Sequence, residues 1–221
     1  MKKLFKDWNQ FEISLLLLSI VAIMFSSIIC KSEILTILAS LVGVTCSLLQ
    51  AKGKVVSQFI GILEVILYSI LSYQNHYYGE VMIDVLVVFP MYVYGVFSWI
   101  THRNEETDTV ESNEISKKEW GILAFASVVG FVLLYCVLKY FNTSQLMISS
   151  LSMVTSLMAT YLITRRSKYS FIFYIGNDII LILLWGIPIL QGEFYLVPVL
   201  VENIVLLLND SYGLKNWNEN I

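Results

Sequence analysis

Four carboxyl side chains lie deep inside long apolar stretches of this chain: Glu64, Asp84, Asp178 and Glu202. A charge at the middle of a bilayer costs at least about 2.5–3.5 kcal/mol on insertion scales. No lysine or arginine lies within the same stretches to pair with these acids. We therefore expect the acids to face a water-accessible cavity or to be neutral, with interhelical hydrogen bonding as the structural alternative.

Helical spacing places amide and aromatic side chains on the same faces as these acids. The predicted binding residues are, in chain order, Glu64, Asp84, Tyr92, Asn177, Asp178, Trp185, Glu202, Asn203 and Asn209. Aromatic rings stack on flat ligands and attract cationic ones, and amides and carboxylates bind hydroxyl groups. The pattern therefore favours a ligand with a flat ring and several hydroxyls. Trp99 and Trp217, close to predicted helix ends, are instead expected in an interfacial aromatic belt.

Other kinds of chemistry find little support in the residue types. His76 and His102 are the two histidines, both outside the apolar stretches, and no H-E-x-x-H or G-x-S-x-G motif occurs. The three cysteines lack metal-ligand spacing, so we expect no metal, no cofactor and no enzyme. An intramembrane aspartyl pair, Asp178 with Asp210 or Asp84, and a purely structural subunit are the alternatives. The basic residues stand in twos and threes beside apolar stretches, a pattern of topology signals and not of nucleic-acid binding.

The elements that must position these residues are membrane-spanning helices. The chain has 221 residues, of which 57% are hydrophobic and 14% charged. Because a spanning helix needs about 20 apolar residues, the sequence predicts an all-α integral membrane protein with eight spans. They cover 11–30, 33–51, 56–73, 80–101, 119–140, 145–164, 170–189 and 194–213. The polar stretch 101–118 is predicted to be a solvated, partly disordered linker.

Prolines and charges refine this picture. Pro90, Pro188 and Pro198 lie in or beside predicted spans, where each is a packing kink or a hinge. Lys31 and Lys139 fall on one side of the predicted membrane, and all other lysines and arginines fall on the side that holds both termini. The positive-inside rule therefore predicts that both termini are cytoplasmic.

The two halves of the chain repeat each other. Asp84, Tyr94-Gly95 and Trp99 match Glu202, Tyr212-Gly213 and Trp217 at one constant separation. Glu64 pairs with Asp178 in the preceding helices, and a basic loop follows the first helix of each half. The sequence predicts an extra helix (1–30), a three-helix repeat (31–101), a cytoplasmic linker with a connecting helix (102–140) and a second repeat (141–221). Parallel repeats of this kind hold a substrate near the bilayer midplane in known transporters.

These motifs resemble the PnuC family of nicotinamide riboside transporters. The resemblance is carried by "LYSILSYQNHYYGEVMIDVLVVFPMYVYGVFSW" and by "NDIILILLWGIPILQGEFYLVPVLVENIVLLLNDSYGLKNW". It implies a SWEET-like 3+1+3 fold, often trimeric, and facilitated diffusion of nicotinamide riboside, an unphosphorylated vitamin precursor that a soluble kinase traps inside. It also implies binding roles for Asn177, Trp185, Asn203 and Asn209.

The sequence departs from the family at two positions. Family members often carry asparagine where this chain has Asp84, and glutamine near Tyr92. Related carriers transport thiamine or riboflavin, so these vitamins are alternative substrates. A proton-coupled carrier that uses the intramembrane acids is a further alternative.

Overall fold

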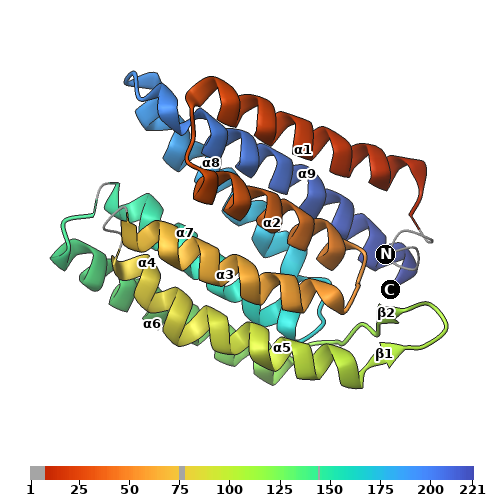
Figure 1. Ribbon diagram of the computed structural model, residues 1–221. Coiled ribbons are helices and arrows are strands. Elements are labelled where there is room, and N and C mark those ends of the chain that lie inside the picture. The colour runs from red at the N-terminus through yellow and green to blue at the C-terminus, as the bar shows by residue number, and fades with distance from the viewer. Residues whose placement is uncertain (1–7, 75–77, 144) are drawn as a thin grey trace.

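The computed structural model describes residues 8–74, 78–143 and 145–221 and shows a bundle of long helices (Figure 1). The helices are α1 (Gln10–Cys30), α2 (Ile34–Ala51), α3 (Val56–Gln74), α4 (Tyr78–Ile83), η1 (Asp84–Val88), α5 (Phe89–Thr101), α6 (Lys117–Tyr140), α7 (Leu146–Thr164), α8 (Ser170–Leu190), η2 (Phe194–Leu196) and α9 (Val197–Asn220). Two short antiparallel strands, β1 (Arg103–Asn104) and β2 (Thr109–Val110), form a hairpin between α5 and α6.

Eight helical segments of the described chain are long and apolar enough to cross a membrane. They match the predicted spans closely, and α4, η1 and α5 together make the fourth one, Val81–Thr101. The last helix is longer than predicted and runs on to Asn220. Many large apolar side chains on the outside of the bundle are exposed, as lipid contact requires. The all-helical membrane fold is therefore confirmed.

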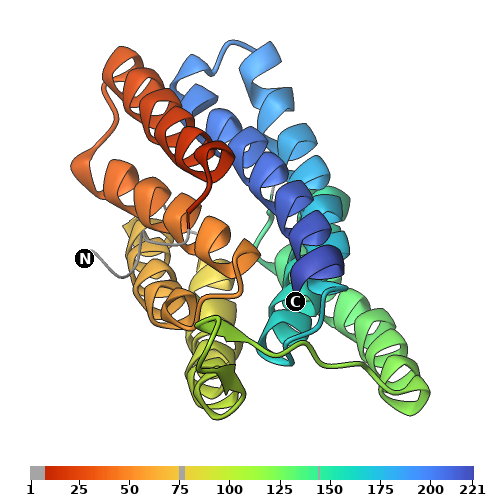
Figure 2. The same ribbon diagram turned by 90° about the vertical axis from the view of Figure 1, so that its right-hand side faces the viewer.

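Six of these helices pack in a closed ring in the order α2, α3, α5, α7, α8, α9 and back to α2. The first three belong to one half of the chain and the last three to the other, so two contacts join the halves: α2 with α9, and α5 with α7. The remaining long helices lie outside the ring. Helix α1 packs against α2 and α9, and α6 packs mainly along α7. Figure 2 shows α5 and α6 on either side of α7.

Helices α2 and α7 end in the same kind of cap. Gly53 (φ 65°) and Arg166 (φ 61°) both adopt the left-handed conformation, and each donates its backbone N–H three residues back, to Gln50 and Ile163 respectively. These are Schellman-type ends, which satisfy the last carbonyls of a helix. Aligning the two caps sets Glu64 opposite Asn177, one residue before the predicted partner Asp178.

The fourth span is irregular where its proline lies. A π-helical turn runs from Asp84 to Val88, and Pro90 stands at the start of α5. Proline has no N–H to donate to the preceding turn, and π-turns inside helices often mark functional positions. The counterpart helix α9 has Pro198 in its first turn instead, where a missing N–H costs nothing, and it continues unbroken.

Most of the linker 102–116 is exposed, as predicted, but it follows an ordered path where partial disorder was predicted. It crosses the end of the bundle that holds the caps of α2 and α7, called here the basic end because Lys52–Lys54 and Arg165–Lys168 lie there (Figure 1). Val110 donates its N–H to Gly53 O at 2.8 Å, and Asn113 donates to Arg166 O at 2.8 Å. Val110 is 1% exposed. Backbone hydrogen bonds to the caps of α2 and α7 order this segment. Its polar composition does not reveal these bonds.

Some predicted features lie outside the described residues. Lys2, Lys3 and Lys6, which contribute to the charge bias, and His76 are among them. The loops after α2 and α7 lie at the same end of the bundle, because the linker bonds to both, and this agrees with the charge count.

Candidate functional site

A polar stripe runs down the inner face of α2. Ser40, Gly43, Ser47 and Gln50 follow each other at helical spacing, and the three side chains are buried. Buried polar groups need hydrogen-bond partners, and here α5 and α9 supply them. This stripe is not among the predicted binding residues. Small polar residues at one-turn and two-turn intervals in an otherwise apolar helix were the available signal.

Glu64 of α3 and Glu202 of α9 meet at Gly43. A Cβ built on Gly43 would lie 3.2 Å from Glu64 Oε1 and 3.4 Å from Glu202 Oε1. Ser40 donates its hydroxyl to Glu202 Oε2 at 2.6 Å. Glycine therefore leaves room for two carboxyl groups, one from each half of the chain, against the same turn of α2.

A second pair of acids lies one turn of α2 further along the stripe, at Ser47. Asp210 of α9 accepts a hydrogen bond from Ser47 at 3.0 Å, and its carboxyl group also contacts that of Asp178 on α8. The neighbouring Asn209 is fully buried and donates Nδ2 to Val44 O at 3.3 Å. Asp210 was predicted only as an alternative aspartyl partner, yet it joins Asp178 to α2.

Two tyrosine hydroxyl groups, those of Tyr92 and Tyr174, also lie near the acid pairs. Tyr92 of α5 packs against Gly61, where a Cβ would lie 2.1 Å from its ring, and its hydroxyl accepts a hydrogen bond from Gln50 at 3.2 Å. The thiol of Cys46 contacts Glu64. Tyr174 of α8 lies within electrostatic range of Asp210, Cys46 and Glu64. Both halves of the chain therefore contribute to one polar cluster inside the ring.

Three buried polar atoms in this cluster have no hydrogen-bond partner among the described residues. They are Asp178 Oδ2, Asn209 Oδ1 and the Tyr174 hydroxyl oxygen. Leaving such an atom unsatisfied costs about 1–3 kcal/mol, so a buried group of this kind needs an explanation. Two acceptors and one hydroxyl on neighbouring helices α8 and α9 could bind a ligand that carries hydroxyl and amide groups.

The predicted asparagines Asn177 and Asn203 make their hydrogen bonds away from the acid pairs. Asn177 faces α7, where its Oδ1 accepts from Thr155 at 2.9 Å and Ser152 at 3.2 Å. Asn203 donates to Val199 O of its own helix at 2.7 Å. Both asparagines are buried, so neither points to lipid. Asn177 precedes Asp178 on α8 and Asn203 follows Glu202 on α9, so both amides lie next to the paired acids along their helices but bond elsewhere.

Asp84 and Trp185 also stand apart. Asp84, buried at the start of the π-turn, accepts a long hydrogen bond from Ser69 of α3 at 3.4 Å. Trp185 is half-buried near the end of α8 that lies away from the basic end. The structure thus gathers Glu64, Tyr92, Asp178, Glu202 and Asn209 around α2 and leaves the remaining predicted residues on other faces.

Trp99 and Trp217 do not form an interfacial belt, contrary to prediction. Both are buried and their rings contact each other, with centroids 5.8 Å apart. Trp99 donates Nε1 to Ile163 O at 2.9 Å, and Trp217 donates Nε1 to Gln50 O at 3.0 Å. Each tryptophan therefore lies near the end of the last ring helix of its half and bonds to the first ring helix of the other half. Together with Val110 they close the ring at the basic end.

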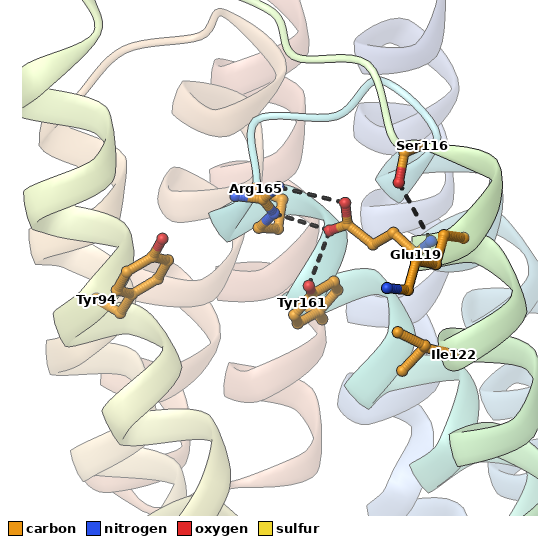
Figure 3. A pocket seen from close by; sticks show the side chains of 7 residues that line it. Tyr94, Ser116, Glu119, Ile122, Tyr161 and Arg165 are labelled. Carbon is orange, nitrogen blue, oxygen red and sulfur yellow. Dashed lines mark hydrogen bonds and ion pairs between the residues drawn. The ribbon is translucent and has the colours of Figure 1, made fainter.

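A cavity of about 450 Å³ lies outside the ring, between α5, α6 and α7 (Figure 3). Its lining residues are Tyr94, Ser116, Lys118, Glu119, Ile122, Tyr161 and Arg165. Arg165 and Glu119 form a two-point ion pair at 2.9 and 3.3 Å. This hydrogen-bonded carboxylate raises the pKa of Arg165, so the guanidinium keeps its charge. None of the predicted binding residues lines this cavity.

The family model described as nicotinamide mononucleotide transporter matches residues 33–219. The chain belongs to this transporter family. It is 28% identical to the nicotinamide riboside transporter PnuC of Neisseria mucosa, over 99% of this chain and 84% of the relative. It is 25% identical to the protein of the same name from Haemophilus influenzae, over 96% of this chain and 91% of the relative.

The solved structures give the same result for the fold. A structure described as the crystal structure of the vitamin B3 transporter PnuC matches with a TM-score of 0.83 and 26% identity, over 99% of this chain and 94% of the other. The resemblance read from the motifs is therefore confirmed. As a member of the nicotinamide mononucleotide transporter family, the chain is a multi-pass membrane transporter and not an enzyme.

Proposed function

We propose that this protein carries nicotinamide riboside across the bacterial cytoplasmic membrane by facilitated diffusion, with access alternating between the two sides. The relatives are named for this substrate. The observation that carries the proposal is the buried cluster in the ring, where Asp178, Asn209 and Tyr174 each keep a polar atom without a hydrogen-bond partner among the described residues.

The chemistry of the cluster suits this substrate. Nicotinamide riboside joins a flat cationic ring, an amide and a ribose with hydroxyl groups. The carboxyl groups around α2 and the ring faces of Tyr92 and Tyr174 would attract the cation. Asn209 Oδ1 and Asp178 Oδ2 would accept hydrogen bonds from hydroxyls. Asn177, Asn203, Trp185 and Asp84 would then act further along the pathway or in a second conformation.

Two alternatives depend on the same residues. A carrier of thiamine or riboflavin would use the aromatic and amide groups with a different ring. A proton-coupled carrier would use the paired acids, because two carboxyl groups in contact, such as Asp178 and Asp210, repel each other unless a proton is shared.

We also propose that both termini are cytoplasmic and that the protein forms a homotrimer. The basic loops at one end support the orientation, and the family resemblance supports the trimer. Accessibility of single cysteines to an impermeant reagent in intact cells tests the first, and the mass of the purified protein in detergent tests the second.

Uptake of labelled nicotinamide riboside into proteoliposomes tests the main proposal. With no ion gradient and no kinase, we expect saturable uptake that a protonophore leaves unchanged. Uptake of thiamine or riboflavin in its place would overturn the substrate, and loss of uptake with the protonophore would favour the coupled carrier.

Asn209→Leu tests the role of the cluster, because it removes Asn209 Oδ1, the buried acceptor proposed to bind a substrate hydroxyl. We expect at least about tenfold weaker binding, the usual effect of losing a buried polar contact to the ligand. Phe97→Leu, on the exposed face of α5, is the control and should bind normally. Unchanged affinity in Asn209→Leu would show that the cluster is not the site.

A further inference from the structure

Two seams join the halves of the ring. Seam A is the contact of α2 with α9, and seam B is the contact of α5 with α7. Helix α2 occupies the place in its half that α7 occupies in the other, and α5 corresponds to α9. The seams are therefore equivalent by construction, and each has one tryptophan bond at the basic end.

The two outer helices start in the same way. Asn9 caps α1 and accepts a bond from Glu12 N, and Ser116 caps α6 and accepts a bond from Glu119 N. Each cap is followed three residues later by glutamate, as in capping boxes. Each glutamate then pairs with the cation that ends the first ring helix of its half, Lys52 or Arg165. Helices α1 and α6 therefore begin in the same way and contact equivalent positions of the two halves.

At seam A the glutamate holds both halves together. Glu12 pairs with Lys52 of the first half at 2.5 Å, and it accepts a hydrogen bond from the Tyr212 hydroxyl of the second half. The charged side chains are almost fully buried, at 7% exposed for Lys52 and 4% for Glu12. Removing one partner of a buried ion pair costs several kcal/mol of folding free energy. Glu12 of α1 therefore stabilises the contact between α2 and α9 at seam A.

At seam B the counterpart glutamate binds one half only. Glu119 pairs with Arg165 and accepts from the Tyr161 hydroxyl at 2.9 Å, and both of these residues belong to the α7 region. Tyr94, the counterpart of Tyr212, interacts with Arg165 and not with the glutamate, so the link between the halves at seam B runs through Arg165 (Figure 3). The α6 pair is also more exposed, at 33% for Arg165 and 19% for Glu119.

The interior of the ring shows the same difference. Along seam A, side-chain hydrogen bonds join Ser40 to Glu202, Ser47 to Asp210, Asn209 to Val44 O, Asn216 to Ala51 O and Trp217 to Gln50 O. Seam B is bordered by two cavities, one of about 450 Å³ at the basic end and one of about 150 Å³ between α4, η1, α6 and α7. The π-turn η1 also lies in a seam B helix.

We propose that seam A is the pivot of the transport movement and that seam B is where the ring opens. Glu12 is the positioning residue of the pivot: through Lys52 and Tyr212 it fixes the ends of α2 and α9 while α5 and α7 separate. This rests on the proposed transport function. Hinges and moving segments are drawn from the less stable parts of a fold, and seam B is the less braced of the two.

Matched cysteine pairs test the pivot in the full chain, with Cys30 and Cys136 replaced by alanine and the buried Cys46 kept. Ala51→Cys with Asn216→Cys spans seam A, where Asn216 bonds to Ala51 O at 2.9 Å. Thr164→Cys with Ser98→Cys spans seam B at the equivalent positions. A short thiol crosslinker at seam A should leave nicotinamide riboside uptake near the uncrosslinked value. The same crosslinker at seam B should lower uptake by about tenfold or more, since it blocks the opening step.

Spin labels on the same two pairs give a readout that needs no transport. We expect two distance populations at seam B and one at seam A, and Glu12→Gln should broaden the seam A distances. If both crosslinks stop uptake equally, or if seam A shows the two populations, the pivot is overturned. If the uncrosslinked protein takes up no nicotinamide riboside, the proposed function fails, and the spin-label distances still decide the pivot.

Discussion

Seams A and B are built from equivalent helices and end in the same tryptophan contact, yet their surroundings differ. Behind seam A, a buried glutamate reaches both halves of the ring. Behind seam B, the equivalent glutamate is bound to one half and is more exposed, and the link to Tyr94 of the other half runs through Arg165. Two copies of one helix pattern can therefore give a fixed contact and a movable one. The difference lies both in the outer helices and in the side-chain hydrogen bonds along seam A inside the ring.

The largest expected effect comes from the glutamate at seam A. Glu12→Gln deprives the buried Lys52 ammonium of this carboxylate, so we expect the folded protein to lose about 3 kcal/mol of stability. Thermal unfolding in detergent, followed for the full chain, measures it. A melting temperature close to that of the unmodified protein would mean that Glu12 does not brace seam A.

Variants of the two tryptophans distinguish an effect on stability from an effect on the opening of seam B. Trp99→Phe and Trp217→Phe each remove one N–H donor and should each cost about 1 kcal/mol of stability. Only seam B opens in the proposed movement, so Trp99→Phe should raise the open population by about fivefold while Trp217→Phe leaves it unchanged. Spin-label distances measure both populations, and equal shifts in the two variants would contradict the asymmetry.

The caps of α2 and α7 test how alike the two halves are at the basic end. Gly53→Ala places a Cβ at φ 65° and 2.6 Å from the Ile221 side chain, and we expect a loss of about 1 kcal/mol. Arg166→Ala at the equivalent position adds no backbone strain but removes a bond to Glu111 O, so its loss should be smaller. Chemical unfolding compares them, and the reverse order would show that the caps are not equivalent.

The smallest expected effect belongs to the ion pair at seam B. Glu119→Gln should cost less than about 1 kcal/mol, because a partly exposed pair is weakened by water and salt. The difference from the unmodified protein should shrink further in high salt. A loss as large as that of Glu12→Gln, or one insensitive to salt, would mean that both outer helices brace their seams equally.

The candidate site was predictable in part. Acids in apolar stretches stand out because their insertion is costly, and Glu64, Asp178 and Glu202 do lie against the α2 stripe with Asn209 and Tyr92. The sequence did not reveal that Asn177 and Asn203 bond elsewhere, because side chains on one helical face can face different neighbours. Ser40, Ser47 and Gln50 were missed because serine and glutamine carry no charge to attract notice.

By itself, the sequence determined the number of spans, the side that carries the basic loops and the family. These follow from local composition, since each helix must be apolar enough to cross the bilayer whatever its neighbours are. Only the tertiary structure decided that Trp99 and Trp217 meet inside the ring, that the linker is ordered, and that Glu12 pairs with Lys52 across two helices. Such contacts depend on which helices pack together, and residues far apart in the chain set that packing.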